Sequence, residues 1–516
     1  MKRRSFIKNL SLASLSLPFV SNGIGMQGIT KKLFDFSKNA EDRVLILIQL
    51  NGGNDGLNTI IPIDQYDNLM IQRQNIIIPE NQILSLSNSL GIHPVMTGMK
   101  NMFDNEKLTV IQNVGYPEQN RSHFRSTDIW TSGSLDSQQT NGWLGRYFDS
   151  QYANFPEDYP NDNFPDPFAI SLGTELTTTC QGLMGNFSHA VKDPFNAVNL
   201  LETSIANDGT YYGSHIEYIA TILNQTNEYG NQISVASNAG NSLSTLYDPT
   251  NSIAVQLKYV AQMISGGMKT KVYILNLGGF DTHDSQVSQT NTTEGEHSIL
   301  LKKLSDALNA FQDDLQLLGL EERVAGMTFS EFGRKIASNG SFGTDHGDAA
   351  PMFLFGKCVN SSIIGPNPQI SNVIDGQAGV TMQIDFRDVY ASILKDWFEV
   401  PISSIQNLFE HNITFLPVLS GCSLGLNEGE TSDLKNFVFP NPTPSNCTLK
   451  ISTLNERVEV FISNLNGQIV KEIGANNLSA GTHLIPCETS DLSPGNYLIQ
   501  VIKNSGSHSL KLQKIK

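Results

Sequence analysis

The chain has 516 residues, a formal net charge of −16 at pH 7 and 16% charged residues. A hydrophobic fraction of 39% is typical of a globular protein and excludes a largely disordered chain. The acidic balance argues against nucleic acid as a partner, because phosphate binding needs clustered Lys and Arg. The length predicts at least two domains, one of them with a sizeable core.

The N-terminus has the pattern of an export signal, which we place at residues 1–26. A basic segment, Met1–Lys8, precedes a short apolar run, Leu10–Val20. The Arg3-Arg4 pair resembles a twin-arginine signal, and a general secretory signal is the alternative. Neither this run nor a later one reaches the ~18 uninterrupted apolar residues of a membrane helix, so no stable membrane span is expected.

Five continuous apolar runs predict buried strands of a mostly parallel sheet. They are Val44–Leu50, Leu108–Ile111, Val272–Leu277, Val324–Phe329 and Met352–Phe355. Between the third and fourth runs, apolar residues recur at spacings of three and four from Leu300 to Leu318, which predicts an amphipathic helix ended by Gly319. Strand, helix and strand form a βαβ unit, so the predicted fold class is α/β.

Three other segments differ in composition from the sheet-forming part. Residues 136–265 are rich in Asn, Ser, Thr, Tyr and Gly, and we interpret them as an inserted, cap-like region. Residues 416–435 are expected to be a linker. Short strands with turn signals such as Asn466-Gly467 then predict a small β-sandwich over residues 436–516.

The chain has five cysteines and no C-x-x-C pair, so a cysteine zinc site is not expected. Cys447 and Cys487 both lie in the C-terminal segment. They could pair with each other there, and two unrelated thiols are the alternative.

Acidic residues follow three of the predicted strands, and they are Asp55, Asp281 and Glu331. Active sites in open α/β sheets form beyond the carboxyl ends of the strands, so these side chains are expected to converge on one edge. Each also has a plainer interpretation. Asp55 could cap its own backbone, and Glu331 could simply pair with Arg334.

Two histidines add imidazole groups to these carboxylates. Asp281 and His283 are two residues apart and would face the same side of an extended segment. Asp345 and His346 come just before the last of the apolar runs. Because His is the commonest transition-metal ligand, the set predicts a metal site, and ordinary polar loops are the alternative.

Ser122 is a candidate nucleophile. It is flanked by Arg121, His123 and Arg125, and a hydroxyl beside cationic groups could attack a phosphoryl or sulfuryl ester. The arginines would hold the nonbridging oxygens. A loop serine hydrogen-bonded to backbone is the alternative.

Six motifs resemble, in this order, those of the domain-of-unknown-function 1501 family over residues 41–415. They are G-G-N-D-G-L-N, S-H-F-R, G-W-L-G-R, G-G-F-D-T-H, S-E-F-G-R and G-T-D-H-G. The family is placed in the alkaline phosphatase and sulfatase superfamily. The resemblance implies an alkaline phosphatase-like fold, with helices on both faces of a mostly parallel sheet. It also implies hydrolysis of phosphate or sulfate esters at a two-metal site with a Ser, Thr or modified Cys nucleophile.

By this resemblance, Asp55 matches the first metal-ligating Asp and Ser122 matches the nucleophile. Asp281 and His283 resemble a ligand pair that the superfamily spaces further apart. Glu331-Phe332-Gly333 stands where the superfamily has Asp-His-Gly, so Phe332 removes one ligand. A rival alignment equates Asp345-His346 with that Asp-His pair and leaves Glu331 unexplained.

The expected catalytic residues are therefore Ser122, Arg121 and Arg125. The expected metal ligands are Asp55, Asp281, His283, Glu331, Asp345 and His346. The implied cofactor is a divalent metal, with zinc expected, and with calcium or magnesium as the ion for an altered second site.

The C-terminal part resembles a type IX secretion sorting domain, type A. The residues that carry the resemblance are Phe439-Pro440-Asn441-Pro442, Asn466-Gly467, Leu492–Tyr497 and Lys511–Lys516. It implies the type IX secretion machinery as a partner, transit through the periplasm, secretion or cell-surface attachment, and removal of the domain. The sequence thus predicts a secreted metal-dependent hydrolase of phosphate or sulfate esters that acts on a small-molecule or glycan substrate. The alternative is a non-catalytic or weakly catalytic surface binding protein on a degenerate hydrolase scaffold.

Overall fold

The computed structural model describes residues 42–196, 209–409, 411–419, 437–453, 456–464, 468–479, 481–503 and 506–515. The expected export signal, most of the expected linker and the Asn466-Gly467 turn lie outside these residues. The chain divides into two compact units, Met1–Cys422 and Ser423–Lys516. No helix among the described residues combines the length and apolar character needed to cross a membrane.

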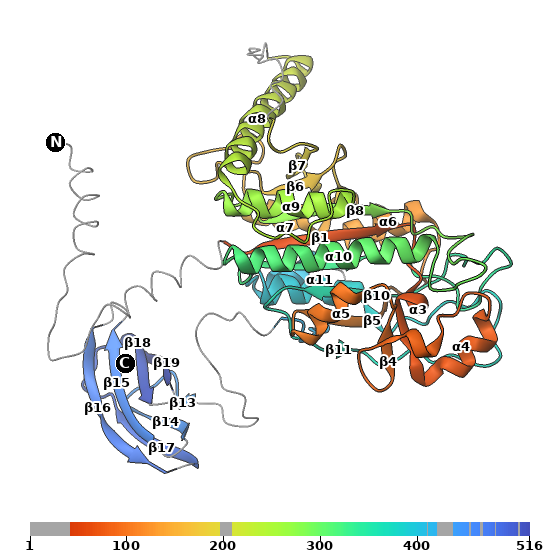
Figure 1. Ribbon diagram of the computed structural model, residues 1–516. Coiled ribbons are helices and arrows are strands. Elements are labelled where there is room, and N and C mark those ends of the chain that lie inside the picture. The colour runs from red at the N-terminus through yellow and green to blue at the C-terminus, as the bar shows by residue number, and fades with distance from the viewer. Residues whose placement is uncertain are drawn as a thin grey trace. The chain divides into compact units, whose positions relative to one another are not determined.

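The larger unit is built on a nine-stranded sheet (Figure 1). Eight strands follow the order β11-β5-β10-β9-β1-β8-β6-β7, and β12 pairs with β5. Only β10, among these described strands, runs antiparallel to its neighbours. The strands are β1 (Val44–Asn51), β5 (Leu108–Gly115), β6 (Ala169–Leu172), β7 (Ser188–Val191), β8 (Val272–Gly278), β9 (Val324–Phe329), β10 (Ala350–Phe355), β11 (Ile363–Ile364) and β12 (Ile384–Asp385).

The predicted strands and the α/β class are confirmed, because all five apolar runs form strands of this sheet. The predicted amphipathic helix is α10 (Glu296–Leu317), and it connects β8 to β9. Gly319 has a φ of 69° just beyond its end, a backbone conformation that glycine adopts without steric cost. Both β8 and β9 pair in parallel with β1, so the carboxyl ends of all three strands meet at one edge.

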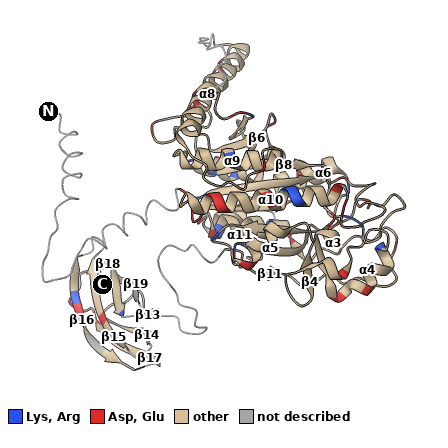
Figure 2. Ribbon diagram, viewed as in Figure 1, with Lys and Arg blue, Asp and Glu red and all other residues tan. Residues whose placement is uncertain are grey.

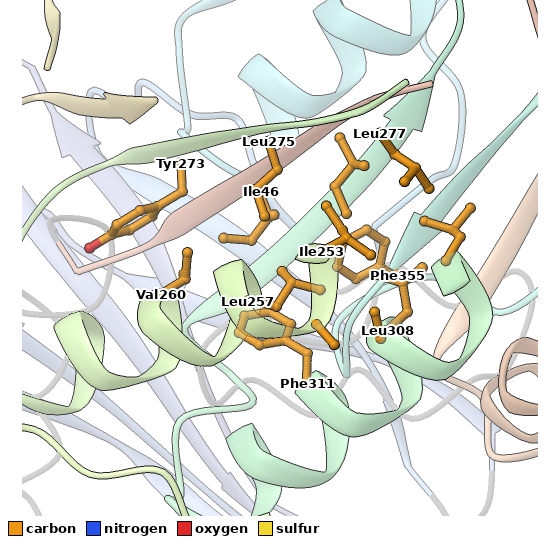
Figure 3. Packing of buried hydrophobic residues seen from close by; sticks show 14 of the residues in the cluster. Ile46, Ile253, Leu257, Val260, Tyr273, Leu275, Leu277, Leu308, Phe311 and Phe355 are labelled. Carbon is orange, nitrogen blue, oxygen red and sulfur yellow. The ribbon is translucent and has the colours of Figure 1, made fainter. Parts of the chain in front are cut away.

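Each face of the sheet buries its own hydrophobic cluster. Successive side chains of a strand point to opposite faces, so Ile46 and Ile48 join one cluster while Leu45 and Leu47 join the other. The first cluster, seen in Figure 3, also contains Leu308 of α10. Helices therefore cover both faces, as expected. They are α5 (Thr97–Asp104), α9 (Ser252–Ser265) and α10 on the first face, and α6 (His123–Ser132), α7 (Trp143–Gln151), α11 (Phe386–Asp396) and α12 (Ile402–Leu408) on the second.

The region 136–265, expected as a cap-like insertion, belongs largely to the main body. Its strands β6 and β7 extend the sheet beyond β8, and its helix α9 packs on one face. These strands have only four residues each, which explains why no long apolar run marks them. The same region contributes the 29-residue helix α8 (Tyr211–Ala239).

The segment that follows α8 is hydrogen-bonded to a buried carboxylate near the C-terminal end of α10. The carboxylate of Asp314 is fully buried and accepts hydrogen bonds from the Ser242 hydroxyl and from the backbone N–H groups of Leu243 and Ser244. These residues follow α8 directly. Figure 2 shows that α10 carries basic and acidic positions in different turns.

A small lobe completes this unit. It has a three-stranded sheet of order β2-β4-β3, two α-helices and single 3₁₀ turns. The elements are α3 (Gly56–Thr59), β2 (Ile60–Pro62), η1 (Ile63–Gln65), α4 (Tyr66–Arg73), η2 (Glu80–Gln82), β3 (Leu84–Ser85) and β4 (Leu90–Ile92), and η3 (Thr178–Cys180) lies elsewhere in the unit.

The C-terminal unit is a small antiparallel β-sandwich, as predicted. Its sheets have the orders β13-β14-β17 and β16-β15-β18-β19, and side chains from both sheets share one buried cluster. Cys447 and Cys487 are register partners across β14 and β17. The strands are β13 (Phe437–Phe439), β14 (Asn446–Thr453), β15 (Glu456–Asn464), β16 (Ile469–Leu478), β17 (Gly481–Glu488), β18 (Gly495–Lys503) and β19 (Gly506–Lys514).

Candidate metal centre

The loops that follow β1, β8 and β9 meet at the carboxyl edge of the sheet. The backbone N–H of Gly52, after β1, donates to Oε1 of Glu331, after β9, at 2.8 Å. The N–H of Phe280, after β8, donates to the carbonyl of Asn51 at 3.0 Å. A Cβ on Gly52 would overlap the backbone of Asp281, so glycine is required for this close approach.

His123, Asp281 and His346 form a group of metal-ligating side chains. One ligand atom from each lies within 4.8 Å of the other two. The carboxylate of Asp281 is central, since its Oδ2 lies 3.5 Å from Nε2 of His123 and its Oδ1 lies 3.1 Å from Nε2 of His346. The structure therefore contains a His/Asp group that could hold a metal ion.

His283 brings a further nitrogen to the same place. Its Nε2 lies 3.2 Å from Oδ1 of Asp281 and 2.9 Å from Nε2 of His346. Residues from the loops after β8 and β9 and from the start of α6 thus present three imidazoles and one carboxylate to each other. Asp281, His283 and His346, three of the expected metal ligands, thus lie together.

The outer nitrogens of the three imidazoles are all held by oxygen atoms. Nδ1 of His123 lies 2.8 Å from Oε1 of Glu331, and Nδ1 of His283 lies 3.1 Å from Oδ1 of Asp345. Nδ1 of His346 lies 2.8 Å from the backbone carbonyl of Arg121. Carboxylate and carbonyl oxygens only accept hydrogen bonds, so each Nδ1 is the donor and each Nε2 faces the centre.

This arrangement could hold a cation at its centre. With both Nδ1 atoms protonated, the Nε2 atoms of His283 and His346 would face each other as two lone pairs at 2.9 Å, beside a carboxylate. A proton or a metal ion must lie between such groups. Imidazole nitrogens and one carboxylate are ligands that suit zinc and related transition metals.

Arg334 holds Asp281 in position. Its side chain is buried, donates to Oδ1 of Asp281 at 2.7 Å, and also contacts four backbone carbonyls around the site. Burial would raise the pKa of Asp281, but the hydrogen bonds from Arg334 and His346 outweigh it and lower that pKa. Burial lowers the pKa of His346, which favours the neutral, metal-binding ring.

Glu331 and Asp345 lie in the outer ring of this site. Glu331 is almost wholly buried and uses Oε1 to accept from both Gly52 and His123. Asp345 pairs with Lys335 at 3.2 Å and with His283. Burial works against ionisation of Asp345, yet hydrogen bonds from Lys335 and His283 lower its pKa. Both carboxylates contact histidines through the ring nitrogen that points outward.

Asp55 is committed to different contacts. Its buried carboxylate pairs with Arg73 at 2.9 Å and accepts from Nε2 of Gln286 at 2.6 Å. It also caps α3 by accepting from the N–H of Leu57 at 3.3 Å. Burial alone would raise the pKa of Asp55, but the charge of Arg73 lowers it. The capping alternative raised from the sequence is thus present, together with an ion pair that no local pattern indicated.

The arginines beside Ser122 are engaged away from it. Arg121 forms a two-pronged ion pair with Asp348, in which both N–O distances are 2.8 Å, and Arg125 donates to the carbonyl of Leu135 at 2.7 Å. Ser122 precedes α6, is exposed, and its hydroxyl does not cap the helix. The guanidinium groups expected to hold an ester anion are therefore directed to protein oxygens.

Phe332 forms a wall behind two of the histidines. Its buried ring lies 4.9 Å from the ring of His123 and 4.6 Å from that of His346, measured between centroids. A Cβ on Gly53 would overlap this ring, so Gly53 is required for it to fit. The phenyl group cannot bind metal, and it positions two imidazoles that can.

Sequence reasoning missed His123 as a candidate ligand. His123 was noticed only as a neighbour of Ser122, although it is the first residue of α6 and the first imidazole along the chain at this site. The motif S-H-F-R contained the signal, since a histidine in a loop motif next to other candidate ligands merits the same attention as His283. Arg73 gave no comparable signal, and Arg334, considered from the sequence as a partner of Glu331, pairs with Asp281 instead.

The chain is similar to several solved structures at low identity. One is a phosphonate monoester hydrolase from Silicibacter pomeroyi, with 9% identity, a TM-score of 0.33, and coverage of 91% of this chain and 88% of the other. Another is a sulfatase from Pseudoalteromonas sp., with 10% identity, a TM-score of 0.29, and coverage of 88% and 86%. A third is the alkaline phosphatase of the Antarctic bacterium TAB5, with 10% identity, a TM-score of 0.25, and coverage of 63% and 94%. Similarity at this level assigns no activity to the chain.

Family comparisons are more specific. No curated protein matches the chain. Residues 437–515 match the secretion system C-terminal sorting domain, which indicates secretion or cell-surface attachment through a type IX system. Residues 42–400 match the family described as "Protein of unknown function (DUF1501)", and the chain belongs to that family.

Proposed function

We propose that the protein is a secreted metal-dependent hydrolase of phosphate or sulfate esters. The observation that carries the proposal is the convergence of three Nε2 atoms on Asp281, with two of those nitrogens 2.9 Å apart. Polar groups this close, with every outer nitrogen already bonded to oxygen, are arranged for a cation. The position of the group at the carboxyl edge of an α/β sheet also supports an active site.

His123, Asp281 and His346 would hold the metal, with His283 as a fourth ligand. Glu331 and Asp345 would orient His123 and His283 rather than bind the ion. A bound divalent metal would polarise an ester oxygen and lower the pKa of a water molecule. Zinc fits this donor set, because three imidazoles and a carboxylate are common zinc ligands.

Ser122 or a water molecule would be the nucleophile. Ser122 lies between Arg121, whose carbonyl holds His346, and His123, so its backbone belongs to the site. Its hydroxyl is exposed and does not cap α6, which leaves it available to a substrate. Since Arg121 is paired with Asp348, we assign it to positioning the carbonyl that His346 contacts, and not to holding the ester anion.

The test measures metal content and turnover on the same purified protein. Elemental mass spectrometry should find close to one equivalent of a transition metal, and p-nitrophenyl phosphate or p-nitrophenyl sulfate should be hydrolysed. Asp281→Asn should lose both, whereas Asp306→Asn, a partly exposed acid paired with Lys302 on α10, should keep both. Protein without metal and without turnover, unchanged by Asp281→Asn, would refute the proposal.

The second candidate is a surface binding protein that uses the same site without efficient turnover. Two observations favour it: Phe332 fills space beside the histidines, and Arg73 neutralises Asp55. With Phe332 and Arg73 in these positions, the described part of the chain has one candidate cation site, whereas a two-metal hydrolase would have two. Metal bound at full occupancy with no hydrolysis of either ester would favour this candidate.

A further inference from the structure

A cleft of about 600 Å³ opens directly beside the candidate metal centre. It shares Gly52, His123 and Glu331 with that centre, and α6 and the loop after β6 line it. A volume of this size is typical of pockets that enclose small ligands. We propose that the cleft binds an uncharged, hydroxyl-rich part of the substrate, such as a run of neutral sugar residues.

The lining is rich in neutral polar groups that both donate and accept hydrogen bonds. Such side chains match sugar hydroxyls, which also donate and accept. The amides are Gln49, Asn51 and Asn276, and the hydroxyls are Thr127, Thr131, Ser171, Thr177 and Thr178. Within the described residues, the Gln49 side chain makes no hydrogen bond, and Asn276 uses only its oxygen, to accept from Asn51 at 3.3 Å.

The charges of the lining exclude a densely anionic ligand. Asp128 and Glu175 are its acidic members besides the buried Glu331, and none of the described lining residues is Lys or Arg. Neither Asp128 nor Glu175 forms an ion pair or a side-chain hydrogen bond with the described residues. Repeated sulfate or phosphate groups along the cleft would therefore meet unneutralised carboxylates. A single ester group would instead lie at the metal end.

Phe124 supplies an aromatic surface at the edge of the cleft. It follows the ligand His123 on α6, and 87% of it is exposed to solvent. Leu176, on another part of the lining, is 54% exposed. Exposed apolar side chains beside convergent polar groups mark binding sites, and the flat C–H face of a sugar ring packs well against an aromatic ring.

This inference deepens the proposed function and names the substrate class of the same site. The hydroxyl-rich part would occupy the cleft while its ester group reaches His123 and the other metal ligands. Because the lining outside the metal centre makes the contacts, binding of the neutral part should not require metal or turnover. That difference separates the two proposals experimentally.

The experiment is calorimetric titration of the full chain with maltohexaose, cellohexaose, xylohexaose and mannohexaose, and with a heparin hexasaccharide as the anionic probe. We expect at least one neutral oligosaccharide to bind and the heparin probe to bind more weakly. Phe124→Ala should weaken neutral binding by about tenfold. Tyr212→Ala, which removes an exposed aromatic ring on α8, should leave neutral binding unchanged.

The same titrations are repeated on chelator-treated protein and on Asp281→Asn. Neutral binding that persists in both would support the cleft. Absence of ester hydrolysis by the untreated, metal-loaded protein would separately refute the hydrolase. Absence of binding by all four neutral probes at millimolar concentration, or tighter binding of the heparin probe, would overturn the cleft proposal even if hydrolysis is found. Binding that Phe124→Ala leaves intact would also overturn it.

Discussion

Oε1 of Glu331 lies 2.8 Å from Nδ1 of His123, and this contact joins the loop after β9 to the first residue of α6. The same oxygen accepts from the N–H of Gly52 at 2.8 Å. A carboxylate buried at a strand end needs such partners, because burial of an unpaired charge is costly. The contact fixes the imidazole so that Nε2 faces Asp281, and under the proposed function it gives Glu331 an indirect role in metal binding.

Glu331→Gln should weaken metal binding without unfolding the protein. The amide keeps the size and one accepting oxygen but loses the charge that makes His123 a stronger ligand. Loss of such an outer contact typically costs 10–100-fold in metal affinity, and we expect roughly that loss here. Competition with a fluorescent chelator would measure it. Glu322→Gln, an exposed acid paired with Lys357, is the matched control and should bind metal normally.

Gly53→Ala should disrupt the site through its shape. Gly53 has a φ of 82°, and an added Cβ would overlap the ring of Phe332, which supports His123 and His346. Strain and overpacking together should cost roughly 2–4 kcal/mol of unfolding free energy and reduce metal affinity. Urea unfolding would measure the first effect.

Gly278→Ala is the control for that change. Gly278 ends β8 on the same edge of the sheet, and an added Cβ there would meet no atom within 4 Å. The Gly278→Ala variant should therefore have the same unfolding free energy as the unmodified protein. Equal stability of the two variants would contradict the role assigned to Gly53.

The sheet was predictable because its strands are buried on both faces and so appear as continuous apolar runs, as in Val324–Phe329. Strands β6 and β7 were not, because four residues give too short a pattern. The prediction that Asp55, Asp281 and Glu331 lie at one edge of the sheet followed from parallel strand ends. The use of each residue there depends on partners distant in sequence, and local patterns do not contain them.

Asp55 and Arg121 show why local patterns are insufficient. Asp55 follows β1 as a metal ligand would, but Arg73 of α4 neutralises it inside the protein. Arg121 adjoins Ser122 in sequence, yet Asp348 holds its guanidinium from another loop. Each residue is therefore one half of an arginine–carboxylate ion pair, and tertiary packing brings its partner to it. The sequence around Asp55 or Arg121 therefore predicts a candidate residue and leaves its partner open.

Acid should destabilise the metal-free protein between about pH 6.5 and pH 4 through His297. Burial lowers the pKa of His297 to about 4, against 6.5 for the free side chain, despite the nearby charge of Asp55. The unfolded chain binds a proton in this window and the folded chain does not, so stability is full above pH 6.5 and falls as the pH drops. The loss should approach roughly 3 kcal/mol.

Urea unfolding at several pH values, with metal removed, would measure how the unfolding free energy depends on pH. His93, whose pKa burial lowers to about 3, should add to it. His297→Gln removes the titrating ring while keeping a donor toward Asn54, whose Oδ1 lies 2.9 Å from Nε2 of His297. The variant should show a flatter dependence, and an unchanged slope would contradict the assignment.

Cys447 and Cys487 should form a disulfide when the protein meets an oxidising environment. They are register partners in the antiparallel pair β14 and β17, both are buried, and both are free thiols in this structure. A hydrogen bond from Cys487 lowers the pKa of Cys447, so the thiolate that starts disulfide exchange is favoured at Cys447. Opposed residues in such a ladder lie at Cα separations that a disulfide can span.

Oxidised glutathione is the reagent for the test. The two thiols would lose two protons and two electrons, glutathione disulfide would take them up as two glutathione molecules, and the protein mass would fall by about 2 Da. The bond should stabilise the sandwich by roughly 3–4 kcal/mol, because it closes a loop of a few tens of residues. Cys180, buried in the other unit, should remain a thiol and serves as the internal control. Alkylation of both Cys447 and Cys487 after oxidation and denaturation would show that they are unrelated thiols, the alternative that the sequence left open.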